Sequence, residues 1–133
     1  MERPVTGLVV IAEDNALNLR LFADVLRGAG YRVAEAGNGA EALARVNELR
    51  PDLLLLDLDL PRMAGDQVAR ALRGDPRHAR LPILLVSAHA REIAERRAAG
   101  AGCDGWLQKP VRPDALLAAV VAQIGPAGPR AIE

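Results

Sequence analysis

Polar side chains that could do chemistry stand at the ends of four short apolar runs in this sequence. These side chains are the carboxylates of Glu13, Asp14 and Asp57, the hydroxyl of Ser87 and the amine of Lys109. Lys109 is the only lysine in a chain that has sixteen arginines. Lysine offers a flexible point charge that suits one phosphate oxygen, whereas arginine presents a planar fork. Chance survival of one surface lysine is the plainer explanation, and only its polar neighbours favour a functional one.

Taken together, these groups would form a site with a definite task. Several carboxylates within a few ångströms are unfavourable without a cation, and oxygen ligands suit Mg²⁺, with Mn²⁺ close behind. The metal and Lys109 would keep Asp57 ionised and neutralise an incoming phosphoryl group, while Ser87 can donate a hydrogen bond to it. A carboxylate nucleophile can form an aspartyl-phosphate, and positioning and charge neutralisation lower the barrier. The chemistry indicated is therefore phosphoryl transfer to Asp57.

The elements that must position these groups are strands and helices in alternation. The expected strands are Leu8–Ala12, Arg32–Ala36, Leu53–Leu56, Ile83–Val86 and Gly105–Gln108. The expected helices are Ala16–Arg27, Ala40–Leu49, Gln67–Arg73, Glu92–Ala99 and Asp114–Ile124. Two of the strands are apolar without alternation, which is typical of the buried centre of a parallel sheet. The pattern predicts an α/β fold, in which ligands bind beyond the carboxyl ends of the strands.

Two of the expected helices differ in how firmly they should pack. In the first, Leu17, Leu21 and Val25 recur every four residues, with Phe22 and Leu26 beside them, so this stripe is expected to cover the sheet. The helix Glu92–Ala99 has only Ile93 as a large apolar anchor, and arginines crowd its polar side. Few apolar contacts place an element at the low-stability end of a structure.

Composition excludes several classes of protein. A chain of 133 residues with 50% hydrophobic and 26% charged residues fits one globular domain. The formal net charge of zero argues against general nucleic-acid binding. The longest apolar stretch, Ala115–Ala122, is too short to span a bilayer, and Met1–Thr6 has no apolar signal region. The single cysteine, Cys103, cannot form an internal disulfide, so we expect a cytoplasmic protein with no membrane association. The expected domain is 1–125, followed by a short disordered tail at 126–133.

The sequence resembles the receiver domains of two-component response regulators over nearly its whole length, from about Leu8 to Ile124. Its marks are the acidic pair in Glu13-Asp14-Asn15, the segment from Asp57 to Gly65, Ser87-Ala88 and Lys109-Pro110. The resemblance implies a five-stranded parallel sheet in the order 2-1-3-4-5, with five helices on both faces, which is the flavodoxin-like receiver fold.

The resemblance also implies roles for the polar residues. Asp57 would take the phosphoryl group from a sensor histidine kinase or a histidine phosphotransfer protein. Asp14 and Asp57 would bind Mg²⁺ directly together with the backbone carbonyl of Asp59, and Glu13 would act through water. Lys109 would pair with the phosphoryl group, and its peptide bond to the following proline would be cis.

Other positions would govern switching. Ser87 would move towards the new phosphate, and Trp106 occupies the aromatic switch position, where tyrosine or phenylalanine is usual. The indole therefore puts the usual switching geometry in doubt, and a partly buried edge-strand aromatic is the plainer interpretation. Asp59 and His89 stand where the family tunes loss of the phosphoryl group. We interpret His89 as a solvent-facing loop residue, and His78 as loop only.

The leading hypothesis is a stand-alone phosphorylation switch, a phosphoacceptor and not a turnover enzyme. Its output would pass to a partner protein through the helix 4–strand 5–helix 5 face, as a monomer or a phosphorylation-dependent dimer. An adaptor and a phosphate shuttle in a phosphorelay are both open.

Two alternatives compete with this hypothesis. Asp57-Leu58-Asp59 after four leucines looks like the motif of haloacid-dehalogenase-type Mg-dependent phosphatases, but the acidic pair comes first and there is no room for a substrate cap. A degenerate receiver that no longer takes phosphate is disfavoured, because all five expected groups are present.

Overall fold

The fold is a parallel sheet between two layers of helices. A computed structural model describes residues 7–127, so the expected lack of a signal region at residues 1–6 and most of the expected tail fall outside the described part. The strands are β1 (Leu8–Ala12), β2 (Arg32–Ala36), β3 (Leu53–Asp57), β4 (Ile83–Ser87) and β5 (Gly105–Gln108). The helices are α1 (Ala16–Gly28), α2 (Gly39–Leu49), α3 (Gly65–Arg73), α4 (Arg91–Gly100) and α5 (Pro113–Ile124), with a short 3₁₀ helix η1 (Pro76–His78).

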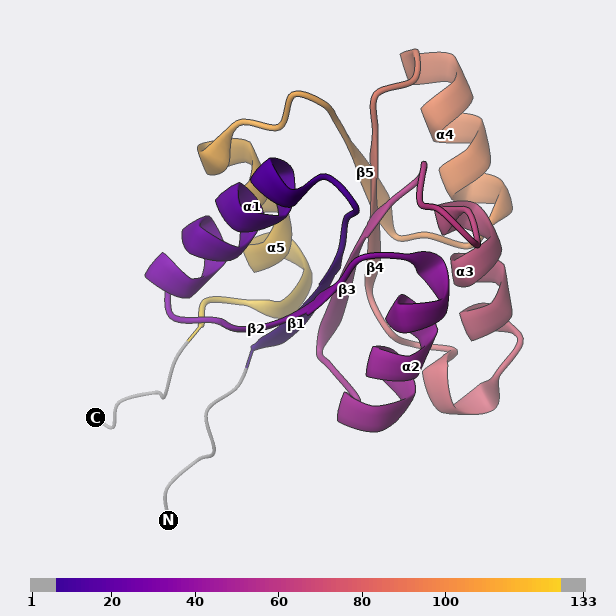
Figure 1. Cartoon of the computed structure of the whole chain (residues 1–133), viewed down its shortest axis with the longest axis horizontal. Helices are drawn as coiled ribbons and strands as arrows, with labels where there is room; N and C mark the ends of the chain where they lie inside the picture. The colour runs from indigo at the N-terminus through magenta and orange to yellow at the C-terminus, as the bar shows by residue number, and fades with distance from the viewer. Residues whose placement is uncertain (1–6, 128–133) are drawn as a thin grey trace.

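All four strand pairs are parallel, and the order across the sheet is β2-β1-β3-β4-β5. This confirms the expected α/β class and the strand order implied by the resemblance. Helices α1 and α5 cover one face, and α2, α3 and α4 cover the other (Figure 1). Among residues 7–127, no helix combines the length and the apolar character needed to cross a bilayer.

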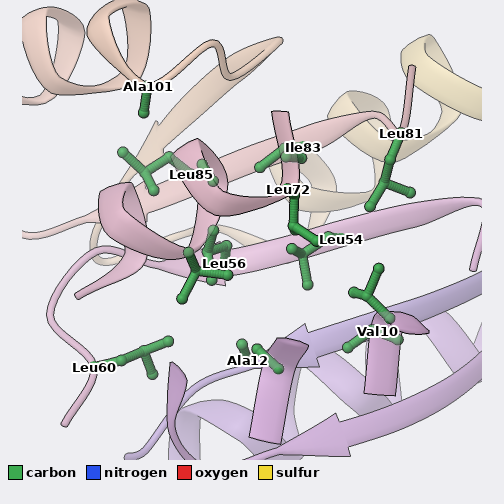
Figure 2. Packing of buried hydrophobic residues seen from close by; sticks show 14 of the residues in the cluster. Val10, Ala12, Leu54, Leu56, Leu60, Leu72, Leu81, Ile83, Leu85 and Ala101 are labelled. Carbon is green, nitrogen blue, oxygen red and sulfur yellow. The ribbon is translucent and has the colours of Figure 1, made fainter. Parts of the chain in front are cut away.

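The core consists of two apolar layers, one on each face of the sheet. Side chains alternate between the faces along each strand. Val10, Leu54 and Leu85 therefore pack under α2, α3 and α4 (Figure 2), whereas Ile11 and Leu55 pack under α1 and α5. The two central strands β3 and β4 are buried at every position, as their unbroken apolar runs predict. These buried strands therefore hold the residues at their carboxyl ends in fixed positions.

Both central strands extend one residue further than their apolar runs. Asp57 and Ser87 are the last residues of β3 and β4, because the main-chain ladder continues past them. The amide of Leu58 donates to the carbonyl of Val86 at 2.8 Å, and the amide of Lys109 donates to that of Ser87, also at 2.8 Å. The two polar groups are thus held by the sheet and not by flexible loops.

The stripe expected to bury α1 is correct only in part. Phe22 and Leu26 are buried together with Ala23, whereas Leu17 and Leu21 are 67% and 52% exposed. The helix begins where Asn15 caps it by accepting a hydrogen bond from the amide of Asn18 at 2.9 Å. The side of α1 with Leu17 and Leu21 and the side with Phe22 and Leu26 are both apolar, so the spacing of these residues could not decide which side packs against β1 and α5.

Two further expectations are wrong. Ile93, the expected anchor of α4, is 42% exposed, and the helix buries only Ala94 and Ala98. His78 is not a plain loop residue, because it lies in η1 and is buried with Nε2 2.8 Å from Oδ1 of Asn47. Its burial depends on the packing of η1 against α2, which a local pattern does not reveal.

Candidate phosphoryl-transfer site

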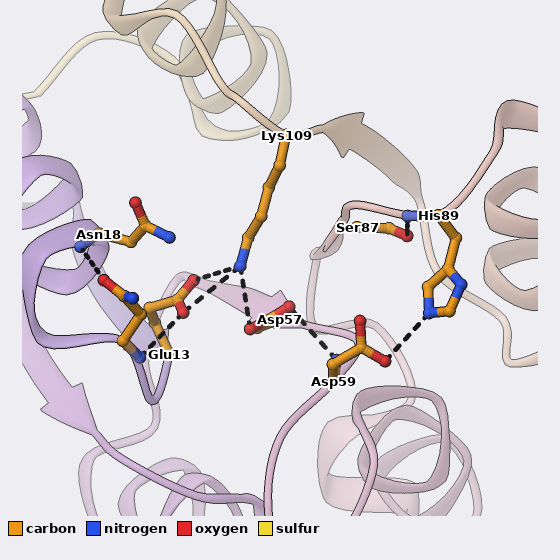
Figure 3. Close-up of polar contacts among 8 residues, drawn as sticks. Glu13, Asn18, Asp57, Asp59, Ser87, His89 and Lys109 are labelled. Atoms are coloured by element: carbon orange, nitrogen blue, oxygen red, sulfur yellow. Dashed lines mark hydrogen bonds and ion pairs between the residues drawn. The ribbon is translucent and has the colours of Figure 1, made fainter.

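The carboxyl ends of four strands bring the predicted polar groups to one edge of the sheet (Figure 3). Glu13 and Asp14 follow β1, Asp57 ends β3 and Ser87 ends β4. Lys109 follows β5, and its peptide bond to the next proline is cis, as the resemblance implies. Parallel strands all point the same way, so residues distant in sequence meet at this edge.

Lys109 joins two buried carboxylates. Its Nζ lies 3.1 Å from Oδ2 of Asp57 and 3.1 Å from Oε1 of Glu13. Both carboxylates are almost fully buried, at 3% and 1% exposure, while Asp14 is exposed at the rim. One ammonium group therefore faces two buried negative charges, and the site carries an excess of negative charge.

The pKa values in the site reflect this imbalance. The pKa of Glu13 is raised by burial and by the charge of Asp57, and Lys109 and the Asn15 amide offset this only in part. Burial opposes the charge of Lys109, but Asp57 and Glu13 outweigh it and raise the lysine pKa. Lys109 is therefore firmly cationic, while Glu13 lacks enough positive charge around it.

The acidic cluster fits a hard divalent cation. Glu13, Asp14 and Asp57 each offer a carboxylate oxygen within 4.8 Å of the others. Glu13 Oε1 is buried without a hydrogen bond from the described residues, although it pairs electrostatically with Lys109. Oxygen-only ligands with one open, exposed side suit an ion that keeps several waters. The side chain of Asp59 lies outside this cluster.

Close packing on the backbone of Asp57 fixes the loop that leads to α3. A Cβ at Gly65 would overlap the carbonyl oxygen of Asp57, so only glycine permits this approach. The amide of Gly65 donates to the carbonyl of Leu58 at 2.8 Å. The start of α3 is thus pressed against the end of β3, directly behind the phosphoacceptor candidate.

Ser87 and His89 connect the opposite side of the site. Ser87 is fully buried, and its Oγ accepts a hydrogen bond from the amide of His89 at 2.9 Å. His89 Nε2 lies 3.0 Å from Oδ1 of Asp59, and Figure 3 shows these two side chains pointing toward each other. The interpretation of His89 as solvent-facing missed this contact. The sequence signal for it was the placement of both residues two positions after Asp57 and Ser87.

Trp106 lies apart from the acidic cluster. It is half-buried on the edge strand β5, opposite Leu85 in register, and packs on the core layer beneath α3 and α4. Cys103 packs on the same layer, and burial raises the pKa of its thiol to about 11. The cysteine is therefore protonated and unreactive at neutral pH.

An apolar groove of about 410 Å³ adjoins the site between α1 and α5. Leu21 and Val25 line it from α1, Val111 and Leu116 line it from the other side, and Lys109 stands among its lining residues. The groove therefore extends from Lys109 to Leu21, one of the leucines that α1 leaves exposed. No pattern in the sequence pointed to this groove, because its walls come from two helices far apart in the chain.

Comparisons with known proteins agree with this arrangement. The model of one family, described as the response regulator receiver domain, matches residues 9–121. The polar-differentiation response regulator DivK of Brucella anthropi is 35% identical over 119 residues, which cover 90% of this chain and 97% of that protein.

Two solved structures extend the similarity to the fold. The chemotaxis response regulator CheY4 of Vibrio cholerae is 28% identical with a TM-score of 0.85, over 90% of this chain and 99% of that one. The receiver domain of a sensor histidine kinase from Pseudomonas aeruginosa, which carries a magnesium ion in its active-site cleft, is 28% identical with a TM-score of 0.84. This match covers 90% of this chain and 98% of that domain.

Proposed function

Because the chain belongs to the response regulator receiver domain family, we propose that Asp57 accepts a phosphoryl group and operates the domain as a switch. The observation that carries this proposal is the bridge from Lys109 to the buried Asp57, 3.1 Å long, beside an acidic cluster. A buried carboxylate paired with a lysine is a suitable oxygen nucleophile.

The transfer proceeds by attack of an Asp57 oxygen on the phosphorus of a phosphohistidine. The new O–P bond forms as the P–N bond breaks, and the bond electrons leave with the imidazole of the donor. Lys109 neutralises negative charge on the transferred group, and the hydroxyl of Ser87 donates a hydrogen bond to one of its oxygens. Asp57 is consumed in the step, so the domain acts as a phosphoacceptor and not as a turnover enzyme.

A divalent cation supplies the remaining charge neutralisation when it is bound. We propose Mg²⁺, with Mn²⁺ as a substitute, held by Asp14, Asp57 and the backbone carbonyl of Asp59, with Glu13 acting through water. The excess of negative charge around Glu13 supports this assignment. The magnesium ion named for the Pseudomonas aeruginosa receiver domain supports it as well.

The phosphoryl donor is a histidine kinase or a histidine phosphotransfer protein. We propose that its helix docks in the groove between α1 and α5, because this apolar surface includes the exposed Leu21 and reaches Lys109, which pairs with the phosphoacceptor. Output then passes to a partner protein through α4, β5 and α5, as an adaptor or a relay. Whether the active form is a monomer or a dimer, and its cytoplasmic location, stay predictions.

The test is the intact mass of the protein after incubation with Mg²⁺ and acetyl phosphate. We expect a single phosphoryl adduct that is absent in Asp57→Asn and fails to form when EDTA removes the metal. Steady release of phosphate with no adduct would instead support the dehalogenase-type phosphatase, which no observation in the structure favours. Neither adduct nor release, including from a histidine-phosphorylated donor, would indicate a degenerate receiver.

A further inference from the structure

A buried carboxylate outside the phosphoryl-transfer site joins two helices. Asp66, in the first turn of α3, is only 7% exposed at its side chain. Its Oδ2 accepts from Nε of Arg97 at 2.9 Å and lies 2.9 Å from Nη2 of the same guanidinium. Arg70, one turn along α3, reaches only 3.7 Å. Asp66 therefore depends mainly on an arginine of α4 to compensate its charge.

The carboxylate has few other partners. Its Oδ1 is buried without a hydrogen bond from the described residues. The start of α3 favours a negative charge through the helix dipole, but this effect is small compared with a fork from a guanidinium. Removing one partner of a buried ion pair leaves an uncompensated charge. The contact between Asp66 and Arg97 is thus sensitive to any displacement of α4 relative to α3.

Helix α4 has little else to hold it. It buries only Ala94 and Ala98, and its largest apolar side chain, Ile93, is half-exposed. Figure 1 shows α3 and α4 as neighbours on the same face of the sheet. An element with few apolar contacts is the one whose position a single ion pair can influence.

Asp66 is also linked to the phosphoacceptor Asp57, through the neighbouring residue Gly65. Gly65 precedes Asp66 and packs so closely on the backbone of Asp57 that a Cβ would overlap it. The hydrogen bond from Gly65 to Leu58 fixes the first turn of α3 to the end of β3. Asp66 therefore moves with the phosphoacceptor strand, while Arg97 moves with α4.

We propose that the pair formed by Asp66 and Arg97 is a clasp that holds α4 in the arrangement described here and opposes its displacement when Asp57 is phosphorylated. This inference rests on the proposed function, since the phosphoryl group is the ligand that must overcome the clasp. If the clasp exists only in the resting arrangement, thermodynamic reciprocity requires that breaking it strengthens binding of a phosphoryl group or its mimic.

The test compares Arg97→Gln with Arg96→Gln. Arg96 is the adjacent arginine, is exposed, and has no ion pair among residues 7–127, so it controls for loss of charge from α4. Beryllium fluoride with Mg²⁺ serves as the phosphoryl mimic, and isothermal titration calorimetry measures its binding. We expect the mimic to bind Arg97→Gln about fivefold more tightly, the size expected of one partly exposed ion pair, and Arg96→Gln as wild type.

A second measurement does not depend on phosphoryl chemistry. Hydrogen exchange of the α4 amides in the metal-free protein should be about fivefold faster in Arg97→Gln than in Arg96→Gln. The double variant Asp66→Asn/Arg97→Gln leaves no buried unpaired charge, so it keeps the comparison valid if the single variant unfolds. It should show the same two effects.

Unchanged or weaker binding of the mimic in Arg97→Gln and in the double variant would overturn the proposal. Unchanged α4 exchange in both would do the same. If wild type itself failed to bind beryllium fluoride, the proposed function would fall, while the exchange comparison would still decide whether the clasp holds α4.

Discussion

At the scale of single residues, the site is a problem of charge balance. Lys109 contacts both Glu13 and Asp57 at 3.1 Å, so one positive charge serves two buried carboxylates. The raised pKa of Glu13, caused first by burial and then by Asp57, expresses the remaining negative charge. This arrangement favours binding of a further cation, and Glu13 is the carboxylate whose charge Lys109 offsets only in part.

Glu13→Gln should therefore stabilise the metal-free protein and weaken its metal binding. The folded-state pKa of Glu13 lies above 4.5, so its favourable contribution is present when it is protonated and is lost as pH rises through that raised value. At neutral pH the amide removes this cost, and each 1 kcal/mol gained raises the melting temperature by about 4 °C. Affinity for Mg²⁺ should fall about tenfold, the usual cost of losing a group that acts on a metal through water.

Thermal unfolding with and without Mg²⁺ measures both effects. Glu92→Gln is the matched control, because this glutamate is exposed on α4 and makes no ion pair within the described part of the chain. A lower melting temperature for metal-free Glu13→Gln would mean that attraction to Lys109 outweighs the cost of burial, contrary to our account.

At the scale of secondary structure elements, α1 has two apolar stripes, of which one is buried and the other is exposed. The stripe around Phe22 packs into the core, and the stripe with Leu17 and Leu21 stays exposed beside the groove. Exposed apolar patches next to a reactive group mark interaction surfaces. The helix therefore supports the sheet and, on our proposal, offers a docking surface to the phosphoryl donor.

Leu21→Glu should slow phosphotransfer from a phosphorylated histidine kinase about tenfold, because a charge in an apolar contact must be desolvated on docking. Labelling by acetyl phosphate, which needs no docking surface, should be unchanged. The kinase used is one that labels the wild-type protein. Leu49→Glu, at an exposed leucine at the end of α2, is the control and should leave both reactions unchanged. An equal loss with both phosphoryl donors would show that the substitution damages the site itself.

At the scale of the whole molecule, the phosphoryl-transfer site lies at the carboxyl ends of the strands, and η1 lies near their amino ends, where it precedes β4. His78 belongs to η1, and its Nε2 lies 2.8 Å from Oδ1 of Asn47. Arg77 also donates to this oxygen, at 3.4 Å, so the oxygen acts as an acceptor and Nε2 of His78 carries the proton. Burial lowers the pKa of His78 below its ordinary value of 6.5.

The fold should therefore lose stability as pH falls below about 6.5. In this pH range the unfolded chain binds a proton at His78 more readily than the folded chain does, so protonation favours the unfolded state. Denaturant unfolding between pH 7.5 and 5.5 should show a smaller pH dependence for His78→Gln than for wild type, even if the variant is less stable at every pH. His89→Gln, at the half-exposed second histidine, is the control for the substitution. Equal pH dependence in wild type and His78→Gln would refute this account.

The sequence by itself determined the order of the elements and the composition of the site. Unbroken apolar runs that alternate with helical stretches favour buried parallel strands, and such strands bring their carboxyl ends to one edge, so the sequence predicts that Asp57, Ser87 and Lys109 lie together. The acidic pair after the first run completes the cluster for the same reason. These inferences are possible because the apolar character of a strand is recorded in its own residues.

Only the tertiary structure decided how the elements face one another. Which stripe of α1 is buried, and the contact from Asp66 to Arg97 across 31 residues, depend on where separate helices settle on the sheet. The burial of His78 against Asn47 has the same origin. The periodicity of a sequence shows which faces of a helix or strand are apolar, but it does not show which neighbouring element each face contacts. Where two faces are equally apolar or equally polar, only the tertiary packing decides which of them makes the contact.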